Sequence, residues 1–187
     1  MIKRIFDLIM SSIMLYFLII PIVLIGLMVK LTSKGSVLYW SDRVGINNNI
    51  FRMPKFRTIC IDTPVVATHL MKNPKAYLTT IGFFLRKFSL DELPQLYSIL
   101  KGDISFVGPR PALYNQYDLI ELRTSKEIHK IIPGVTGWAQ INGRDKLQIP
   151  TKVEFDEYYL KNRSFILDLK ILLATFIKVV RSENITH

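Results

Sequence analysis

The amino-acid sequence predicts an α-rich α+β fold whose N-terminal helix enters a membrane. Three features support this prediction: a long apolar run near the N-terminus, two short β-prone stretches, and several helical periodicities in the remaining chain. The length of 187 residues is typical of a single integrated domain. We place a membrane anchor at residues 1–34 and a domain at the membrane surface, with several amphipathic or interfacial helices, at residues 35–187.

The anchor is predicted from the run Leu8–Val29, which contains no charged residue. As a helix this run would measure roughly 33 Å, enough to cross the hydrocarbon core of a bilayer. A cleaved signal peptide is disfavoured because no small-residue cleavage site follows. A spanning helix and a helix that enters the membrane and returns both remain. Pro21 removes a backbone hydrogen bond in the middle of the run and therefore predicts a kink there.

Basic residues at both ends of the run favour the returning, or re-entrant, helix. Lys3 and Arg4 precede the run, and Lys30 and Lys34 follow it. Basic residues prefer the cytoplasmic side of a membrane, so a re-entrant helix keeps both ends there, whereas a spanning helix leaves one end outside. We therefore expect a re-entrant helix kinked at Pro21, with the spanning helix as the alternative.

The rest of the sequence predicts a small β-hairpin followed by helices. The β-prone stretches 37–40 and 50–56 flank a turn-forming segment at 45–49, and Pro54 places the second stretch at a sheet edge. Helices are expected at 79–88, 89–102, 152–159 and 165–180. The last of these is apolar around most of its circumference, which fits a helix in the membrane interface or a buried core helix.

The composition restricts the class of partner. The formal net charge is +10, so the partner is anionic: nucleic acid, an anionic membrane surface, or a phosphorylated ligand. A nucleic-acid binder explains the charge but not the two apolar ends of the chain, so we expect no nucleic-acid partner. The single cysteine, Cys60, excludes an internal disulfide and a cysteine metal cluster.

Two adjacent carboxylates, Asp91 and Glu92, are the first candidates for chemistry. Ser89 and Glu92 have the spacing of a capping box, which predicts the acidic pair in the first turn of a helix. The partial positive charge of a helix N-terminus favours ionised carboxylates, which suit a nucleophile or a metal ligand better than a general acid. A hard cation such as Mg²⁺ accepts a few carboxylates together with phosphate oxygens. First-turn acidic residues are also common in purely structural helices, so the pair gains weight only from its neighbours.

Cations near the acidic pair point to a phosphorylated substrate. Arg110 lies between Pro109 and Pro111, whose restricted backbone angles give its guanidinium a stiff platform for binding phosphate. An incidental arginine in an exposed turn is the alternative. The other candidate phosphate ligands are Arg86, Lys55, Arg57 and Arg144. Each of these cations alone could be a solvated surface charge. Their combination with two carboxylates indicates a site for a phosphorylated substrate instead.

The motifs that contain these residues resemble those of the bacterial sugar transferases, or monotopic phosphoglycosyl transferases. The matching stretches are KFRT at 55–58, LRKFSLDELPQ at 85–95, LKGDISFVGPRP at 100–111 and PGVTGWAQINGR at 133–144. The resemblance extends from Lys3 to about Arg181. The chain departs from the family pattern at Ile20, where serine often precedes the kinking proline, and at Ile59, where methionine is common.

The resemblance implies an enzyme that transfers a sugar 1-phosphate from a UDP-sugar to undecaprenyl phosphate and releases UMP, at the cytoplasmic face of the bacterial inner membrane. Residues 35–187 would form its catalytic domain. Asp91 would attack the sugar-proximal phosphorus and form an aspartyl-phosphosugar, and Glu92 would place Mg²⁺ or the substrate. Arg86 and Arg110 are the first candidates for binding phosphate, ahead of the other three cations.

The resemblance also gives expectations for the pathway and the partners. Such a reaction is the first membrane step in the assembly of O-antigen, capsule, exopolysaccharide or glycoprotein glycans. Small members of the family often use an N-acetamido sugar, so we expect one here. Further expected partners are membrane lipids, downstream glycosyltransferases and a second copy of the chain. The main alternative is a non-catalytic, membrane-anchored protein that binds polyprenyl or other anionic lipid phosphates, against which the intact Asp91–Glu92 pair argues.

Overall fold

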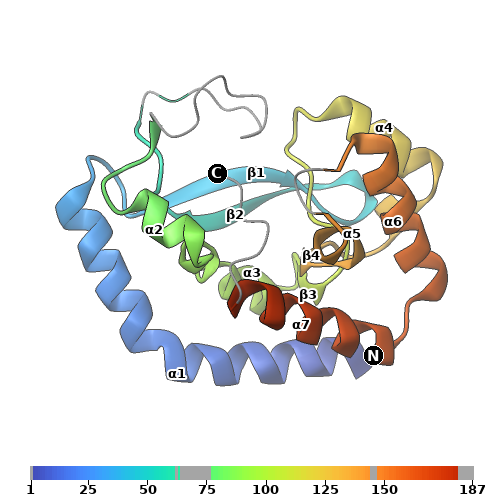
Figure 1. Cartoon of the computed structure of the whole chain (residues 1–187), viewed down its shortest axis with the longest axis horizontal. Coiled ribbons are helices and arrows are strands. Elements are labelled where there is room, and N and C mark those ends of the chain that lie inside the picture. The colour runs from blue at the N-terminus through green and yellow to red at the C-terminus, as the bar shows by residue number, and fades with distance from the viewer. Residues whose placement is uncertain (1, 62, 64–76, 144–146, 181–187) are drawn as a thin grey trace.

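The computed structural model describes residues 2–61, 63, 77–143 and 147–180. Helix α1 (Ile2–Thr32) runs along one side of the molecule, and the small sheets and the remaining helices lie on one side of it (Figure 1). The other helices are α2 (Gly82–Lys87), α3 (Gln95–Lys101), α4 (Tyr117–Ser125), α5 (Trp138–Ile141), α6 (Ile149–Asn162) and α7 (Phe165–Val180). The strands are β1 (Leu38–Val44), β2 (Ile50–Phe56), β3 (Ser105–Val107) and β4 (Gly134–Thr136). The prediction of a helix-rich α+β fold is confirmed.

Helix α1 is long and apolar enough to cross a membrane. It has 31 residues, and its most apolar window has a mean hydropathy of 2.7 with only 11% of that window buried in the protein. Pro21 lies inside the helix, and in Figure 1 the helix axis changes direction about midway along its length. Proline has no N–H to donate to the carbonyl one turn earlier, and its ring crowds that carbonyl, so a bend is expected there.

Polar contacts tie the start of α1 to the rest of the protein. Lys3 Nζ lies 2.6 Å from a carboxylate oxygen of Asp168 in α7 and 3.0 Å from the hydroxyl of Tyr159 in α6. The Arg4 guanidinium donates to the carbonyls of Ile99 and Leu100 in the last turn of α3, at 2.5 and 2.7 Å. The buried Asp7 carboxylate accepts a backbone N–H of β3 at 3.2 Å. Lys3 and Arg4, from which the sequence analysis inferred the orientation of the helix in the membrane, therefore also hold the anchor against the domain.

The predicted hairpin is present, with a longer first strand than expected. β1 and β2 pair antiparallel, from Leu38 opposite Phe56 to Val44 opposite Ile50. Both strands of this two-stranded sheet are edge strands, so Pro54 fits within β2 without breaking a central ladder. The parallel pair β3–β4 was not predicted, because three-residue strands are too short to show a period of two.

The core lies between the hairpin, α3 and α1. Buried Met53 of β2 packs with Leu96 and Ile99 of α3, and apolar side chains of α1 such as Leu15 and Leu18 cover this cluster. One face of the anchor helix is therefore part of the protein core rather than of the lipid-facing surface.

Helix α7 has the predicted bounds and two apolar faces. Ile171 is fully buried in the core, whereas Ile166, Leu173 and Phe176 are exposed. The sequence left an interfacial helix and a core helix as alternatives, and α7 has the features of both. α6 is longer than predicted, and α2 is shorter, beginning at Gly82 rather than Thr79.

The predicted capping box at Ser89 is wrong. Ser89 adopts a left-handed conformation (φ 54°, ψ 23°), makes no side-chain capping bond, and precedes a 3₁₀ turn at Leu90–Glu92. The following helix, α3, begins only at Gln95, after Pro94. In an α-helix starting at Ser89, Pro94 would lack its hydrogen bond to the carbonyl of Leu90 and its ring would crowd that carbonyl. The backbone uses i→i+3 hydrogen bonds here instead, such as Glu92 N–H to Ser89 O at 3.2 Å.

Candidate active site

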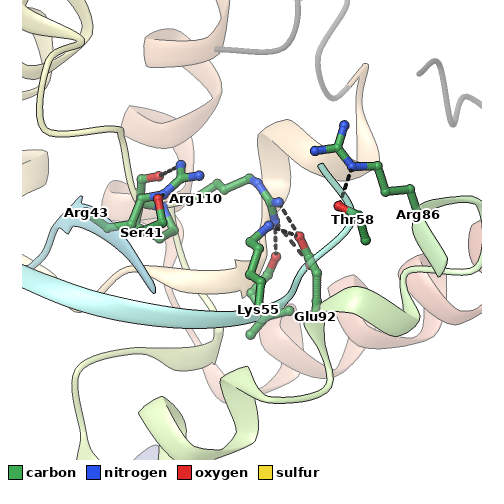
Figure 2. A network of polar contacts seen from close by, with 9 residues as sticks. Ser41, Arg43, Lys55, Thr58, Arg86, Glu92 and Arg110 are labelled. Carbon is green, nitrogen blue, oxygen red and sulfur yellow. Dashed lines mark hydrogen bonds and ion pairs between the residues drawn. The ribbon is translucent and has the colours of Figure 1, made fainter. Parts of the chain in front are cut away.

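Three elements bring Lys55, Glu92 and Arg110 together (Figure 2). Lys55 lies near the end of β2, Glu92 ends the 3₁₀ turn, and Arg110 follows β3. Lys55 Nζ lies 2.7 Å from Oε1 of Glu92, and one Arg110 nitrogen donates to the same oxygen. A second Arg110 nitrogen lies 3.5 Å from Oε2 of Glu92 and 3.3 Å from the Val135 carbonyl oxygen. One carboxylate is thus held by two cations from separate segments.

This arrangement keeps Glu92 ionised. Burial alone would raise the pKa of Glu92, but the charges and hydrogen bonds of Arg110 and Lys55 outweigh burial and hold it well below its usual value. Burial lowers the pKa of Lys55, and the charge of Glu92 opposes this effect. Glu92 is therefore a negative charge that contacts two cations.

The neighbouring Asp91 has the opposite electrostatic character. Its side chain is buried, with 7% of its surface exposed. Burial raises its pKa, the charge of Glu92 adds to the effect, and Lys55 and Arg86 oppose it. The argument from a helix N-terminus, which predicted a carboxylate stabilised in its ionised form, is therefore wrong for Asp91. A buried carboxylate with a raised pKa is poorly solvated and more basic than a solvated one, which suits a nucleophile.

The remaining predicted cations differ in their position. Arg86, at the end of α2, donates from Nε to the hydroxyl of Thr58 at 3.1 Å, and the charge of Asp91 acts on it (Figure 2). Arg57 instead donates to the carbonyl and the hydroxyl of Ser36, both at 2.8 Å, in the loop that follows α1. Arg144 lies outside the described residues. The structure thus groups Lys55, Arg86 and Arg110 around the acidic pair and directs Arg57 elsewhere.

Sequence reasoning missed the groups that hold the Arg110 backbone. Arg123 of α4 donates to the Arg110 carbonyl at 2.8 Å and makes an ion pair with Asp156 of α6, at 2.6 and 3.0 Å. Both partners of this pair are buried. Arg43 of β1 donates to the next carbonyl, that of Pro111, at 3.2 Å. This ion pair has no local sequence signal, since Arg123 and Asp156 are far apart along the chain.

The acidic pair fits a magnesium ion that is held mainly by substrate phosphates. No group of three or more His, Cys, Asp or Glu side chains lies together in the part of the chain that the structure describes. Oε1 of Glu92 contacts both Lys55 and Arg110, whereas Oε2 lies 3.5 Å from a nitrogen of Arg110. Mg²⁺ usually takes one or two carboxylates and completes its shell with phosphate oxygens and water. Oε2 of Glu92 and the Asp91 carboxylate are the oxygens that fit this requirement.

Comparison with known proteins shows which family this chain is similar to. Residues 1–182 match the family described as bacterial sugar transferase. An uncharacterized sugar transferase, EpsL, from Bacillus subtilis (strain 168) is 41% identical over 98% of this chain, and the match covers 89% of that protein.

Several relatives have names that state a reaction, and two of them also name the nucleotide sugar. The UDP-glucose:undecaprenyl-phosphate glucose-1-phosphate transferase of Escherichia coli (strain K12) is 38% identical over 95% of this chain. The UDP-N-acetylgalactosamine-undecaprenyl-phosphate N-acetylgalactosaminephosphotransferase of Aeromonas hydrophila is 36% identical over 80% of it. The matches cover 40% and 37% of those two proteins, so the chain spans less than half of their length.

Proposed function

Because this chain belongs to the bacterial sugar transferase family, we propose that it transfers a sugar 1-phosphate from a UDP-sugar to undecaprenyl phosphate. The observation that carries this proposal is the pairing of a buried, basic Asp91 with a Glu92 that holds Lys55 and Arg110 in place. Two relatives are named for this reaction type, with glucose and with N-acetylgalactosamine.

In the first step the Asp91 carboxylate attacks the sugar-proximal phosphorus of the UDP-sugar. A bond forms between an Asp91 oxygen and that phosphorus, and the bond from the phosphorus to the bridging oxygen of the diphosphate breaks. The bridging oxygen leaves with UMP. The guanidinium of Arg110 and the ammonium of Lys55 lie beside the attacking group, where they can neutralise phosphate charge as it shifts toward UMP.

In the second step a phosphate oxygen of the polyprenyl acceptor attacks the same phosphorus. The bond to Asp91 breaks, its carboxylate is regenerated, and the sugar remains on a polyprenyl diphosphate. Arg86 has its guanidinium near Asp91 and is proposed to bind phosphate in both steps. This product begins the assembly of a surface polysaccharide or a related glycan.

Mg²⁺ is proposed to enter with the diphosphate of the donor. When bound, it would supply positive charge that makes UMP a better leaving group. Oε2 of Glu92 and the Asp91 carboxylate are its proposed protein ligands. The carboxylate of Glu92 keeps its orientation through Lys55 and Arg110 whether or not the cation is present.

The raised pKa of Asp91 predicts an acid limb in the pH–rate profile. The ionised carboxylate is the nucleophile, so the transfer rate should fall as the pH falls through its pKa, at a higher pH than for an ordinary aspartate near pH 4. The pH profile of kcat/KM for the UDP-sugar, which reports groups of the free enzyme, measures this limb, and its apparent pKa belongs to the interacting acidic pair. A rate that stays constant down to about pH 4 would contradict the burial argument.

We also propose that α1 is re-entrant, so that both of its ends lie on the cytoplasmic face of the inner membrane. Basic residues at both ends, Pro21 within the helix and the change in axis direction in Figure 1 support this proposal. The contacts of Lys3 and Arg4 with the domain also favour it, because the N-terminal end of α1 lies beside α3 and α7. A nucleophile held at this depth can reach a phosphate that is attached to a membrane lipid.

Membrane topology gives a direct prediction for α1. Small tags at the N-terminus and at the C-terminus should both resist a membrane-impermeant label applied to the periplasmic side of spheroplasts. Both should react once the membrane is permeabilised, which serves as the internal control. Periplasmic labelling of the N-terminal tag alone would establish a spanning helix instead.

The proposed donor sugar is N-acetamido-substituted, and the function is tested with a panel of UDP-sugars. UMP release should require both a UDP-sugar and undecaprenyl phosphate for multiple turnovers, and should be fastest with an N-acetamido sugar. Preference for glucose or galactose would correct the sugar while leaving the reaction in place. Absence of UMP release with every donor, in the presence of Mg²⁺ and acceptor, would refute the reaction itself.

A further inference from the structure

A cavity of about 260 Å³ extends from the acidic pair toward the two membrane-facing helices. Glu92 and Arg110 line one end of the cavity. Most of its remaining wall is apolar and includes Met14 of α1, Leu96 and Ile99 of α3, Phe106 of β3, and Leu172 and Val179 of α7. The cavity thus joins the charged site to two helices, α1 and α7, that carry exposed apolar side chains.

We propose that this cavity binds the phosphate-proximal isoprene units of the polyprenyl acceptor. The proposal rests on the proposed function and adds where the acceptor lies and which helices bind it. It also assigns a second role to α1 and α7, which would form part of the acceptor site in addition to anchoring the protein.

The chemistry of the wall favours an apolar chain over the sugar or the uridine. Several polar groups of the wall already have partners: the hydroxyls of Thr136 and Thr175 lie 2.7 Å apart, and Lys178 donates to the carbonyl of Ile141. A sugar in this cavity would bring many hydroxyl groups against apolar side chains without hydrogen bonds, which is unfavourable. A hydrocarbon loses nothing there and gains contact with the wall.

The size of the cavity sets how much of the acceptor it can hold. A dry, apolar protein cavity of about 150 Å³ accommodates benzene, which has six carbon atoms. By the same ratio this cavity holds on the order of ten carbon atoms, or about two isoprene units. The rest of the long chain would continue into the bilayer alongside α1 and α7.

Two amide groups in the wall indicate that the occupant also carries a polar head. Gln95 is 2% exposed, and its Nε2 has no hydrogen-bond partner within the described ranges. Oε1 of Gln140 is buried and is likewise unpaired there. Both residues line this cavity, so a purely hydrocarbon occupant would leave both groups unsatisfied. A phosphate oxygen can accept from Gln95, and the hydroxyl of a singly protonated phosphate can donate to Gln140.

The position of these groups matches the second chemical step. Glu92 and Arg110 line the same cavity, and Asp91 is adjacent to Glu92 in the chain. An acceptor with its chain between α1 and α7 would therefore present its phosphate beside the aspartyl-phosphosugar. Donor chemistry would not need the apolar part of the cavity, so the two half-reactions should respond differently when that part is filled.

The test is to fill the cavity with Leu172→Trp and to use Leu173→Trp as the matched control. Leu172 lines the cavity, whereas Leu173 is 62% exposed on the apolar outer face of α7. In Leu172→Trp, exchange of labelled UMP into the UDP-sugar without acceptor should stay within about twofold of wild type. Its kcat/KM for undecaprenyl phosphate should fall at least tenfold, about the effect of losing two buried methylene groups. Leu173→Trp should change neither measurement.

Equal acceptor kinetics in Leu172→Trp and Leu173→Trp would overturn the proposal. A second test uses wild-type protein, so that no folding defect of a variant can affect it. It compares kcat/KM for acceptor phosphates with one, two and three isoprene units. The kcat/KM value should rise at least tenfold from one unit to two and much less from two to three. Equal values for one and two units would also overturn it. If either contrary result is obtained with an enzyme that still turns over, only the acceptor site is refuted and the proposed function stands. If wild-type protein releases no UMP at all, the proposed function is refuted.

Discussion

Replacement of Asp91 by asparagine is expected to reduce sugar-phosphate transfer by at least about 10³-fold while the protein remains folded and membrane-bound. The amide has nearly the same shape as the carboxyl group but cannot form the aspartyl-phosphosugar. Burial already disfavours the ionised form of Asp91 in the folded protein, so a neutral side chain should not lower the free energy of unfolding. The measurement is UMP release with a UDP-sugar and undecaprenyl phosphate, together with the amount of folded protein in the membrane fraction.

Asp103 provides the matched control for this variant. Its carboxylate pairs with the exposed Lys101 at 2.9 Å, at the end of α3, so Asp103→Asn removes a charge of the same type in a solvated pair. Such pairs contribute little to stability, and transfer should remain close to wild type. Activity of Asp91→Asn within about tenfold of Asp103→Asn would exclude Asp91 as the nucleophile.

Replacement of Arg110 by lysine is expected to reduce kcat/KM for the UDP-sugar by about 10²-fold, despite the unchanged charge. One guanidinium reaches both oxygens of Glu92 and the carbonyl of Val135, and a single ammonium cannot reproduce this geometry. Loss of the forked hydrogen bonds would remove one of the contacts that lower the pKa of Glu92, while the charge at position 110 remains. Steady-state kinetics with varied UDP-sugar at saturating acceptor measures the effect.

Arg52→Lys is the control for Arg110→Lys. Arg52 lies in the same hairpin as Lys55, and its guanidinium stacks over the ring of Trp40, 5.5 Å from the ring centre. Exposed contacts of this type have a small effect on stability, so activity should be nearly unchanged. An Arg110→Lys variant that loses no more activity than Arg52→Lys would show that charge alone, rather than a forked geometry, is needed at this position.

Long periodic segments and local motifs were read correctly from the sequence. The bounds of α7 and of β2 agree with the structure, because each segment has a clear apolar pattern and is delimited by turn-forming or polar residues. The motif resemblance identified Lys55, Asp91, Glu92 and Arg110 as candidates, and the structure brings the four together. The resemblance strengthened this set, since no single one of these residues is distinctive by itself.

The errors in the site prediction have physical causes. A single proline, Pro94, displaced the start of the helix and removed the assumed cap at Ser89. Strand β2 ends at Phe56, and the next residue, Arg57, donates to Ser36 in the loop after α1 rather than lying with Lys55 at the acidic pair. The pKa of Asp91 depends on burial by distant segments, which local spacing does not reveal. The same holds for Arg123, whose partner Asp156 lies on another helix.

The covalent intermediate on Asp91 is the central claim, and intact-protein mass spectrometry tests it most directly. Wild-type protein incubated with Mg²⁺ and its UDP-sugar, without acceptor, should gain the mass of one sugar phosphate. Peptide mapping should place this mass on Asp91, and addition of undecaprenyl phosphate should remove it. A protein that turns over without any such adduct, or with the adduct on another residue, would contradict this mechanism.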